Sequence, residues 1–527
     1  MMVAVARLRP PAALVGGALV GLSLPPLGSW PMAVAGVCLL GWSLADRPAR
    51  SRMGLGMLAG IGQFSISLAW AIQFNTAGYV ALLLVEAGFV AVACALVPPT
   101  RGRVPGLVGA LVLAEFARES WPFGGLPLGG IALGQMDGPL GLTARLGGPL
   151  LVVGVTVLAG ASLAALLPGM QYREGERPRD GEKTTTADAG TPRRDRTQRP
   201  SQPAVAVAGI AAVSALAVIA AVAPNGTGSR GEKAAGAPRP IAVAIVQGGG
   251  ARGLDQLEVP ASVVLAAAVR ETRQVPRGVQ LILWPEDVVG LSGPFVGSGA
   301  ERQLASIARS HHATLVAGVT YPVGATRFRN EIVALSPAGR LVATFEKVHR
   351  VPFGEYVPDR GFFEHFANLS DIPRDAIPGT GSGMITTPAG RFAVLVSYED
   401  FFSNRGLSGV RAGGKILLVP TNTSSYSSSQ APAQELAASK LQAIEEGRYL
   451  LQASPTGYSA IIDSDGNVRS RTSLSVPAVI RATVPLLSAR TWYEMVGDTP
   501  VLLAATVLLV GGWAAALSRR RRNRAER

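Results

Sequence analysis

The chain has only two cysteines in 527 residues, Cys38 and Cys94, and both lie within apolar segments near the N-terminus. The region 224–498 has none, which excludes disulfides and a cysteine nucleophile there. Histidine is also scarce, with four in the chain, and the adjacent pair His311 and His312 is not spaced for one helix face. We therefore expect no zinc site, no other metal site and no cofactor.

Charged residues are also few, at 16% of the chain, whereas apolar residues make up 48%. This balance is unusual for a soluble enzyme, and several apolar runs approach the roughly 20 residues that cross a bilayer. The first run follows Arg7 and Arg9 but has no small-residue cleavage site after it, so a membrane anchor is favoured over a signal peptide. Eight crossings are predicted, two of them short, at about 10–25, 31–45, 53–73, 79–97, 105–117, 148–168, 204–223 and 499–517.

The net charge of +14 raises the question of nucleic-acid binding, but the distribution of the basic residues argues against it. With eight crossings and a cytoplasmic N-terminus, every basic cluster falls on the cytoplasmic side, which is the positive-inside pattern. The same topology places 224–498 outside the cytoplasm and both termini inside. The basic clusters lie at 47–52, 101–103, 172–199 and 519–527.

The pattern changes along the chain from long apolar runs to an alternation of short strands and helices. The alternation begins at Ile241 and predicts an α/β domain. Before it, a segment mixes both charges with Pro, Thr and Gly and has no apolar periodicity, which is typical of disorder. The predicted parts are a transmembrane bundle of six helices (1–168), a disordered cytoplasmic linker (169–203), a seventh helix (204–223), the α/β domain (237–491), an eighth helix (499–518) and a basic cytoplasmic tail (519–527).

Three apolar strands of the α/β domain are each followed by a residue that is suited to chemistry. Pro285 ends one strand and Glu286 projects beyond it, Lys347 follows a second strand, and Ser397 follows a third. Sites in open α/β sheets gather at the carboxyl ends of strands, so we expect these side chains to meet. Together they supply a general base, an oxyanion stabiliser and a point of covalent attack.

This trio resembles the Glu, Lys and Cys of the nitrilase superfamily, and its surroundings resemble the apolipoprotein N-acyltransferases, which are bacterial membrane enzymes. The resemblance covers almost the whole chain. Its residues are Lys347 with Val-Pro-Phe-Gly-Glu-Tyr-Val-Pro at 351–358, Ser397-Tyr398-Glu399 against the family's Cys-Tyr-Glu, Ala443-Ile-Glu-Glu-Gly-Arg448 followed by Thr456-Gly-Tyr-Ser459, and Glu115-Phe-Ala-Arg118 in the membrane half.

The resemblance implies an α-helical membrane bundle of about eight transmembrane helices plus an extracytoplasmic α/β nitrilase-like α-β-β-α sandwich domain. It implies a ping-pong transfer of a fatty acyl chain from a phospholipid donor to the N-terminal amine of a diacylated lipoprotein, at the bilayer of a bacterial inner or plasma membrane. The implied roles are general base for Glu286, oxyanion stabiliser for Lys347, nucleophile for Ser397, and support for Glu355, Glu399 and Tyr398.

The chain departs from the family most sharply at Ser397, where the family has cysteine. An alcohol has a pKa far above the thiol value of about 8.5, so Ser397 must lose its proton during attack rather than before it. Glu286 is a weak base for this task unless burial raises its pKa. Serine therefore predicts a slower reaction. The loop 422–426 also lacks an aromatic of the family's Asn-Asp-x-Trp-Phe, and Gln442 replaces an arginine.

Alternative interpretations stay open at this point. Ser397 is also interpreted as a small residue packed at a strand end without a chemical role. The whole chain is then a catalytically silent membrane scaffold that assists a partner enzyme. A hydrolase is a third possibility. Gly248–Gly253 fits a dinucleotide-binding turn with Glu271 as its acidic partner, but a plain turn is favoured. Glu399-Asp400 fits a magnesium site less well than a solvated turn. The apolar residues after Pro358 are either a contact with the membrane surface or ordinary core: Phe362, Phe363, Phe366 and Leu369.

Overall fold

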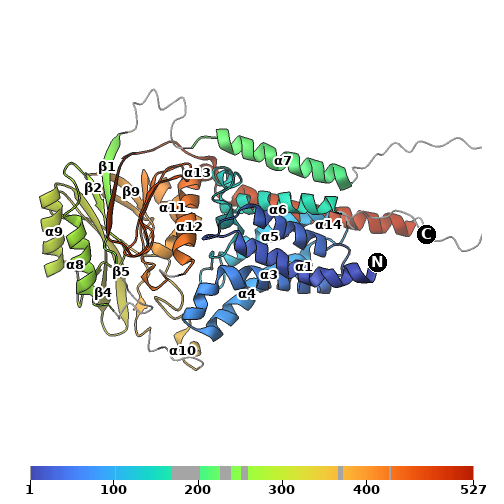
Figure 1. Cartoon of the computed structure of the whole chain (residues 1–527), viewed down its shortest axis with the longest axis horizontal. Helices are drawn as coiled ribbons and strands as arrows, with labels where there is room; N and C mark the ends of the chain where they lie inside the picture. Colours follow the sequence, from blue (N-terminus) through green and yellow to red (C-terminus); the bar gives the residue numbers. More distant parts are fainter. Residues whose placement is uncertain are drawn as a thin grey trace, which may run out of the picture.

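Helices gather at one end of the molecule and a β-rich unit at the other (Figure 1). The computed structural model describes residues 2–100, 102–167, 202–225, 239–250, 259–365, 369, 372–426 and 429–525. Residues 169–201 of the predicted linker lie outside the described part of the chain, as does Phe366.

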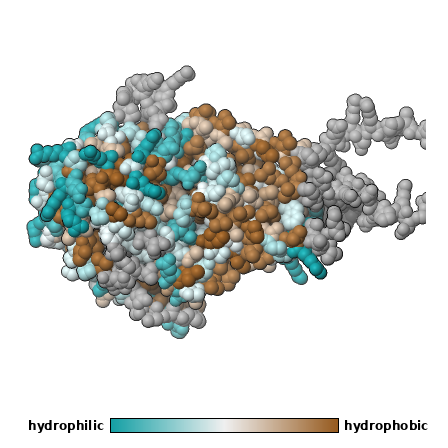
Figure 2. All heavy atoms as spheres, viewed as in Figure 1, coloured by the Kyte–Doolittle hydropathy of each residue, from teal (hydrophilic) through white to brown (hydrophobic). Residues whose placement is uncertain are grey.

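All eight apolar segments form helices, as their composition predicts. Within the described residues, four spans are long and apolar enough to cross a membrane: 76–96, 141–166, 204–222 and 499–518. The surface over this end of the molecule is largely hydrophobic, whereas the β-rich end is mostly hydrophilic (Figure 2). The remaining four crossings stay predictions. The helices are α1 (Met2–Leu22), α2 (Pro31–Ser43), α3 (Ala49–Ser67), α4 (Thr76–Leu96), α5 (Arg103–Arg118), α6 (Ala144–Leu166), α7 (Gln202–Val222) and α14 (Thr499–Ala525).

The β-rich unit contains two sheets, and each has parallel strands at its centre. The first has the order β14-β1-β2-β4-β5-β6, with β3 (Val289–Gly290) and β7 (Asp375–Ala376) attached to β4 and β5; the second has the order β13-β12-β11-β10-β9-β8. The first sheet contains β1 (Pro240–Gln247), β2 (Leu281–Leu283), β4 (Thr314–Val323), β5 (Arg327–Leu335), β6 (Leu341–Glu346) and β14 (Ala478–Pro485). The second contains β8 (Met384–Thr387), β9 (Gly390–Val394), β10 (Ile416–Pro420), β11 (Leu450–Ala453), β12 (Ala460–Ile462) and β13 (Val468–Arg471).

The two sheets pack face to face, and helices cover both outer faces. One buried cluster joins side chains of the two sheets, among them Val316 and Phe392. A second joins the first sheet to α8 (Ala261–Thr272) and α9 (Gly299–His311). A third joins the second sheet to α11 (Ser403–Arg411) and α12 (Ala431–Glu446). The unit is thus a four-layer α-β-β-α sandwich.

Helix α12 joins the sandwich to the membrane helices. Its residues Leu436 and Ala443 pack with the second sheet, whereas Ala437 and Leu441 belong to the same buried cluster as residues of the bundle. Near its start, the Gln434 side chain donates a hydrogen bond of 2.8 Å to a carbonyl of α3. Since one helix is buried on both sides, the two parts of the molecule share a core.

A buried arginine fixes the loop that follows α5. Arg118 pairs with Glu86 at 2.8 Å and with Glu115 at 2.9 Å, and it also donates to the Leu128 carbonyl. Gly125 of this loop accepts a hydrogen bond of 2.9 Å from the Tyr398 hydroxyl. The residue after Ser397 is therefore tied to the membrane half.

Two of the aromatic residues after Pro358, Phe362 and Phe363, are not core residues. Phe362 is 54% exposed, in the short helix α10 (Arg360–Phe363). Phe363 contacts Phe353 and also Phe123 of the membrane half, with ring centroids 4.9 and 6.3 Å away. An exposed aromatic cluster thus lies where the sandwich meets the bundle.

Candidate active site

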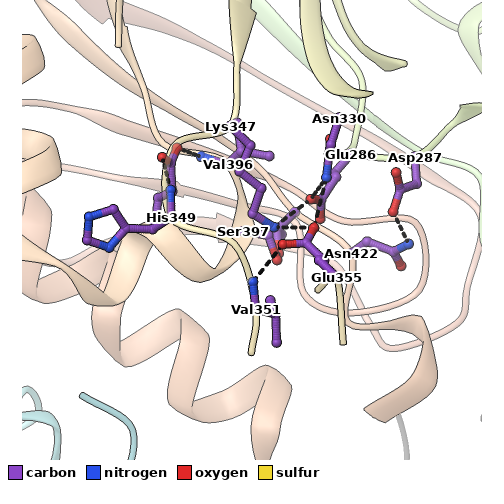
Figure 3. Close-up of polar contacts among 12 residues, drawn as sticks. Glu286, Asp287, Asn330, Lys347, His349, Val351, Glu355, Val396, Ser397 and Asn422 are labelled. Atoms are coloured by element: carbon purple, nitrogen blue, oxygen red, sulfur yellow. Dashed lines mark hydrogen bonds and ion pairs between the residues drawn. The ribbon is translucent and has the colours of Figure 1, made fainter. Parts of the chain in front are cut away.

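Three charged side chains and one amide form a compact cluster at the carboxyl ends of β2 and β6 (Figure 3). Lys347 Nζ lies 3.0 Å from Glu286 Oε1 and 2.9 Å from Glu355 Oε1. Asn330 of β5 donates to the same two oxygens, at 2.8 and 3.0 Å. The Lys347 and Glu286 side chains are only 2% and 3% exposed. One ammonium therefore faces two carboxyl groups away from water.

Local backbone structure brings Glu286 into this cluster. The Trp284 amide donates to Val316 of β4 at 2.8 Å, and Pro285, which has no amide proton, ends the strand. The chain then crosses closely over β4. The closeness is shown at Gly318, where an added Cβ would lie 2.5 Å from the Glu286 Cα. Glycine at position 318 thus allows the close approach that sets the position of Glu286.

Ser397 lies on the turn between β9 and the short helix η6 (Ser397–Phe401), with a backbone φ of +52°. This left-handed conformation is costly for a residue with a side chain, and such strain is concentrated at functional sites. The Ser397 hydroxyl is 3.2 Å from Thr421 Oγ1, just beyond β10. Thr421 bonds to Glu435, which lies within electrostatic reach of Glu286 and Lys347. The three predicted residues therefore share one site (Figure 3).

Glu399 fastens the Ser397 turn to the loop that carries Lys347. Its Oε2 accepts from the Val396 amide at 2.8 Å, and its Oε1 accepts from the Val348 and His349 amides at 2.8 and 3.1 Å. Arg405 lies 3.3 Å from Oε1 and balances the charge. Glu355 acts similarly within its loop, since its Oε2 accepts from the Val351 amide at 2.7 Å. Both carboxylates hold backbone in place.

Burial and charge shift the pKa values of Glu286 and Lys347 in different ways. Burial raises the pKa of Glu286 to about 7, although Lys347 partly opposes this shift. For Lys347, burial lowers the pKa, but Glu286 and Glu355 together raise it by more, so the ammonium stays charged at neutral pH. A carboxyl group that titrates near neutrality beside a permanent positive charge is suited to proton transfer and oxyanion stabilisation.

Comparison with known proteins accounts for both halves of the chain. Residues 16–162 match the family model "Apolipoprotein N-acyltransferase N-terminal domain", and residues 242–494 match "Carbon-nitrogen hydrolase". An apolipoprotein N-acyltransferase of Mycolicibacterium smegmatis is 31% identical over 553 residues, which cover 97% of this chain and 87% of that protein. This chain belongs to the apolipoprotein N-acyltransferase family.

Another apolipoprotein N-acyltransferase also matches almost the full length of this chain. A protein of that name from Azotobacter vinelandii is 29% identical, with 97% of this chain and 95% of that protein covered. Among solved structures, Nit3 of Saccharomyces cerevisiae, of the nitrilase superfamily, is 19% identical with a TM-score of 0.36, covering 50% of this chain and 96% of that one. With its four long apolar helices, the chain is a membrane protein.

Three polar residues of this family member's site were not found from the sequence. Asn330 bridges two carboxyl groups, Thr421 contacts Ser397, and Glu435 contacts Thr421. The signal was weak. Asn330 stands between the charged residues Arg329 and Glu331, and Glu435 lies in a helix that contains other polar residues, so either is easily read as a surface position. The loop 422–426 lies beside the site, where Asn422 donates to Asp287 at 3.2 Å.

Gly249 and Gly250 of the predicted glycine turn and the acidic pair at 399–400 are engaged in contacts within the protein. The Gly249 and Gly250 amides donate to protein carbonyls at 2.8 and 2.9 Å, so they are not free for a phosphate; residues 251–253 lie outside the described part. Glu271 accepts from Gln274 at 2.7 Å. Glu399 is occupied by amides, and Asp400 accepts from a serine hydroxyl at 2.6 Å. Both are buried, so the solvated turn expected at 399–400 was wrong.

Proposed function

We propose that this chain is an apolipoprotein N-acyltransferase that moves a fatty acyl chain from a phospholipid to the N-terminal amine of a diacylated lipoprotein through a Ser397 ester. The observation that carries the proposal is the left-handed Ser397 turn beside the buried Glu286–Lys347–Glu355 cluster. A silent scaffold has no use for a strained serine next to a desolvated acid and ammonium, each of which lowers stability.

The reaction proceeds in two steps. Ser397 Oγ attacks the phospholipid ester carbonyl while Glu286 takes its proton, and Lys347 stabilises the oxyanion. The bond between the acyl carbon and the glycerol oxygen then breaks, and the leaving glycerol oxygen takes the proton from Glu286. The lipoprotein amine attacks the serine ester, gives its proton to Glu286, and Ser397 recovers a proton as its C–O bond breaks. Exchange of one ester for another is nearly isoenergetic, and formation of the amide drives the sequence forward.

The membrane arrangement fits two lipid-anchored substrates. We place eight helices across a bacterial inner or plasma membrane, with both termini cytoplasmic and the sandwich outside, by the positive-inside rule. The exposed Phe362 and its aromatic neighbours then lie at the outer surface of the bilayer, where aromatic side chains are favoured. Both the donor phospholipid and the acceptor lipoprotein reach the site laterally.

Mass spectrometry of a reporter lipoprotein tests the proposal. The full chain is expressed in a host that lacks its own acyltransferase, beside the Ser397→Ala and Ser397→Cys variants. We expect wild type and Ser397→Cys to add an amide-linked acyl chain and Ser397→Ala to add none. Activity of the cysteine variant alone would overturn the role of serine. Failure of all three, with folded protein in the membrane, would favour the scaffold.

A further inference from the structure

The Ser397 hydroxyl has one hydrogen-bond partner in the part of the chain that the structure describes, and it is not Glu286. That partner is Thr421, at 3.2 Å. Thr421 Oγ1 is also hydrogen-bonded to Glu435 Oε1. The three side chains come from the end of β9, the end of β10 and helix α12, and they form a continuous chain of hydrogen bonds that leads away from the nucleophile.

Glu435 is a buried carboxyl group that forms no ion pair within the described residues. Its side chain is 2% exposed, and within the described residues its Oε2 has no hydrogen-bond partner. The charged groups that face it are Asp400 from η6, Glu286 from the end of β2 and Lys347 from the end of β6. Lys347 is already shared by two other carboxyl groups. An ionised Glu435 would be an uncompensated buried charge, so the neutral acid is favoured.

The protonation of Glu435 fixes the direction of every bond in the chain. A hydroxyl carries one proton, so Thr421 donates either to Glu435 or to Ser397. A neutral Glu435 can itself donate to Thr421, which leaves the threonine proton for Ser397 Oγ. The Ser397 proton is then directed away from Thr421 and is available to Glu286.

We propose that Thr421 and a protonated Glu435 form a donor chain that stabilises the Ser397 oxygen as it becomes an alkoxide. The inference rests on the proposed acyltransferase function and adds two residues to it. Thr421 contacts the reacting oxygen, and Glu435 is a positioning residue that acts through Thr421. No proton crosses the chain: Glu286 takes the serine proton, and Thr421 donates a hydrogen bond to the negative charge that remains on Oγ. Such help matters for an alcohol, whose anion is far less stable than a thiolate.

The test measures acyl-enzyme formation from phospholipid by the full-length protein in a single turnover. We expect Thr421→Val to slow this step roughly 10- to 100-fold, since loss of one donor to a developing oxyanion has effects of about this size or larger. Thr421→Ser should retain the rate. Glu435→Gln should also retain it, because the amide still donates to Thr421, whereas Glu435→Ala should not.

Two readouts separate this role from a structural one. The first is the alkaline side of the pH profile: burial raises the pKa of Glu435 to about 8, so wild-type activity should fall above that pH and Glu435→Gln should lose this fall. The second is the Ser397→Cys background, in which Thr421→Val should have a much smaller effect. An equal effect in both backgrounds, or wild-type rates for Thr421→Val, would overturn the inference. Absence of acyl-enzyme from wild type would instead overturn the proposed function.

Discussion

At the scale of single residues, the site combines a strained serine with a buried carboxyl group, Glu286, whose pKa is raised. Ser397 has a φ of +52°, a conformation that the turn between β9 and η6 imposes. Glu286 is buried so deeply that its pKa rises to about 7 from the usual carboxyl value, which makes it a far better base than an exposed glutamate. In the proposed mechanism, this raised pKa partly compensates for the use of an alcohol, not a thiol, as the nucleophile.

A pH profile follows from this shift. The base is active as the carboxylate, so acyl-enzyme formation should fall as the pH drops through about 7 and Glu286 becomes protonated. Glu286→Gln should lower the rate by roughly 10²- to 10⁴-fold and remove the acidic fall. The exposed Glu364→Gln serves as the matched control and should leave the profile unchanged. An acidic fall that survives in Glu286→Gln would assign the titration to another group.

At the scale of the elements, the crossing of β4 by the segment after β2 sets the position of the base. Gly318→Ala adds a methyl group 2.5 Å from the Glu286 Cα and 2.7 Å from the Pro285 carbonyl oxygen, so one of the two segments must move. A shift of about 1 Å in a catalytic group lowers rates roughly 100-fold. We expect a loss of that size in single-turnover acylation. Gly293→Ala, with nothing within 4 Å of its added Cβ, should show none; equal rates for both variants would contradict the argument.

Among the elements and the residues that follow them, some were predictable from the sequence and others were not. Strands β2, β6 and β9 were predictable from apolar runs, and the residues after them were recognisable because they end those runs within familiar motifs. Thr421 and Glu435 were not, since their partners are set by how α12 packs against the second sheet. Helix bounds were also less accurate where composition is uniform: the apolar run at 148–168 belongs to a helix that begins at Ala144 and bends at Gly147 and Gly148.

At the scale of the whole molecule, the sandwich and the bundle depend on each other for a complete core. Ala437, Ala438, Leu441 and Ile444 of α12 pack with bundle residues. A fragment of residues 239–498 exposes this face, so we expect it to aggregate without detergent, as judged by size-exclusion chromatography. The full chain in detergent is the control and should elute as one species. A monodisperse fragment that unfolds cooperatively would show that the sandwich is independent.

The pairing of β1 with β14 has a consequence for synthesis. β1 is the first strand of the sandwich and β14 is the last. One edge of β1 pairs with β14, antiparallel over the full length of both strands. That edge remains open until almost the entire unit has left the ribosome, immediately before α14. During this interval the exposed strand is a template for wrong pairing with other chains. Closure of the first sheet therefore waits for the last strand of the unit, and a chain that ends before residue 478 would keep this edge of β1 open.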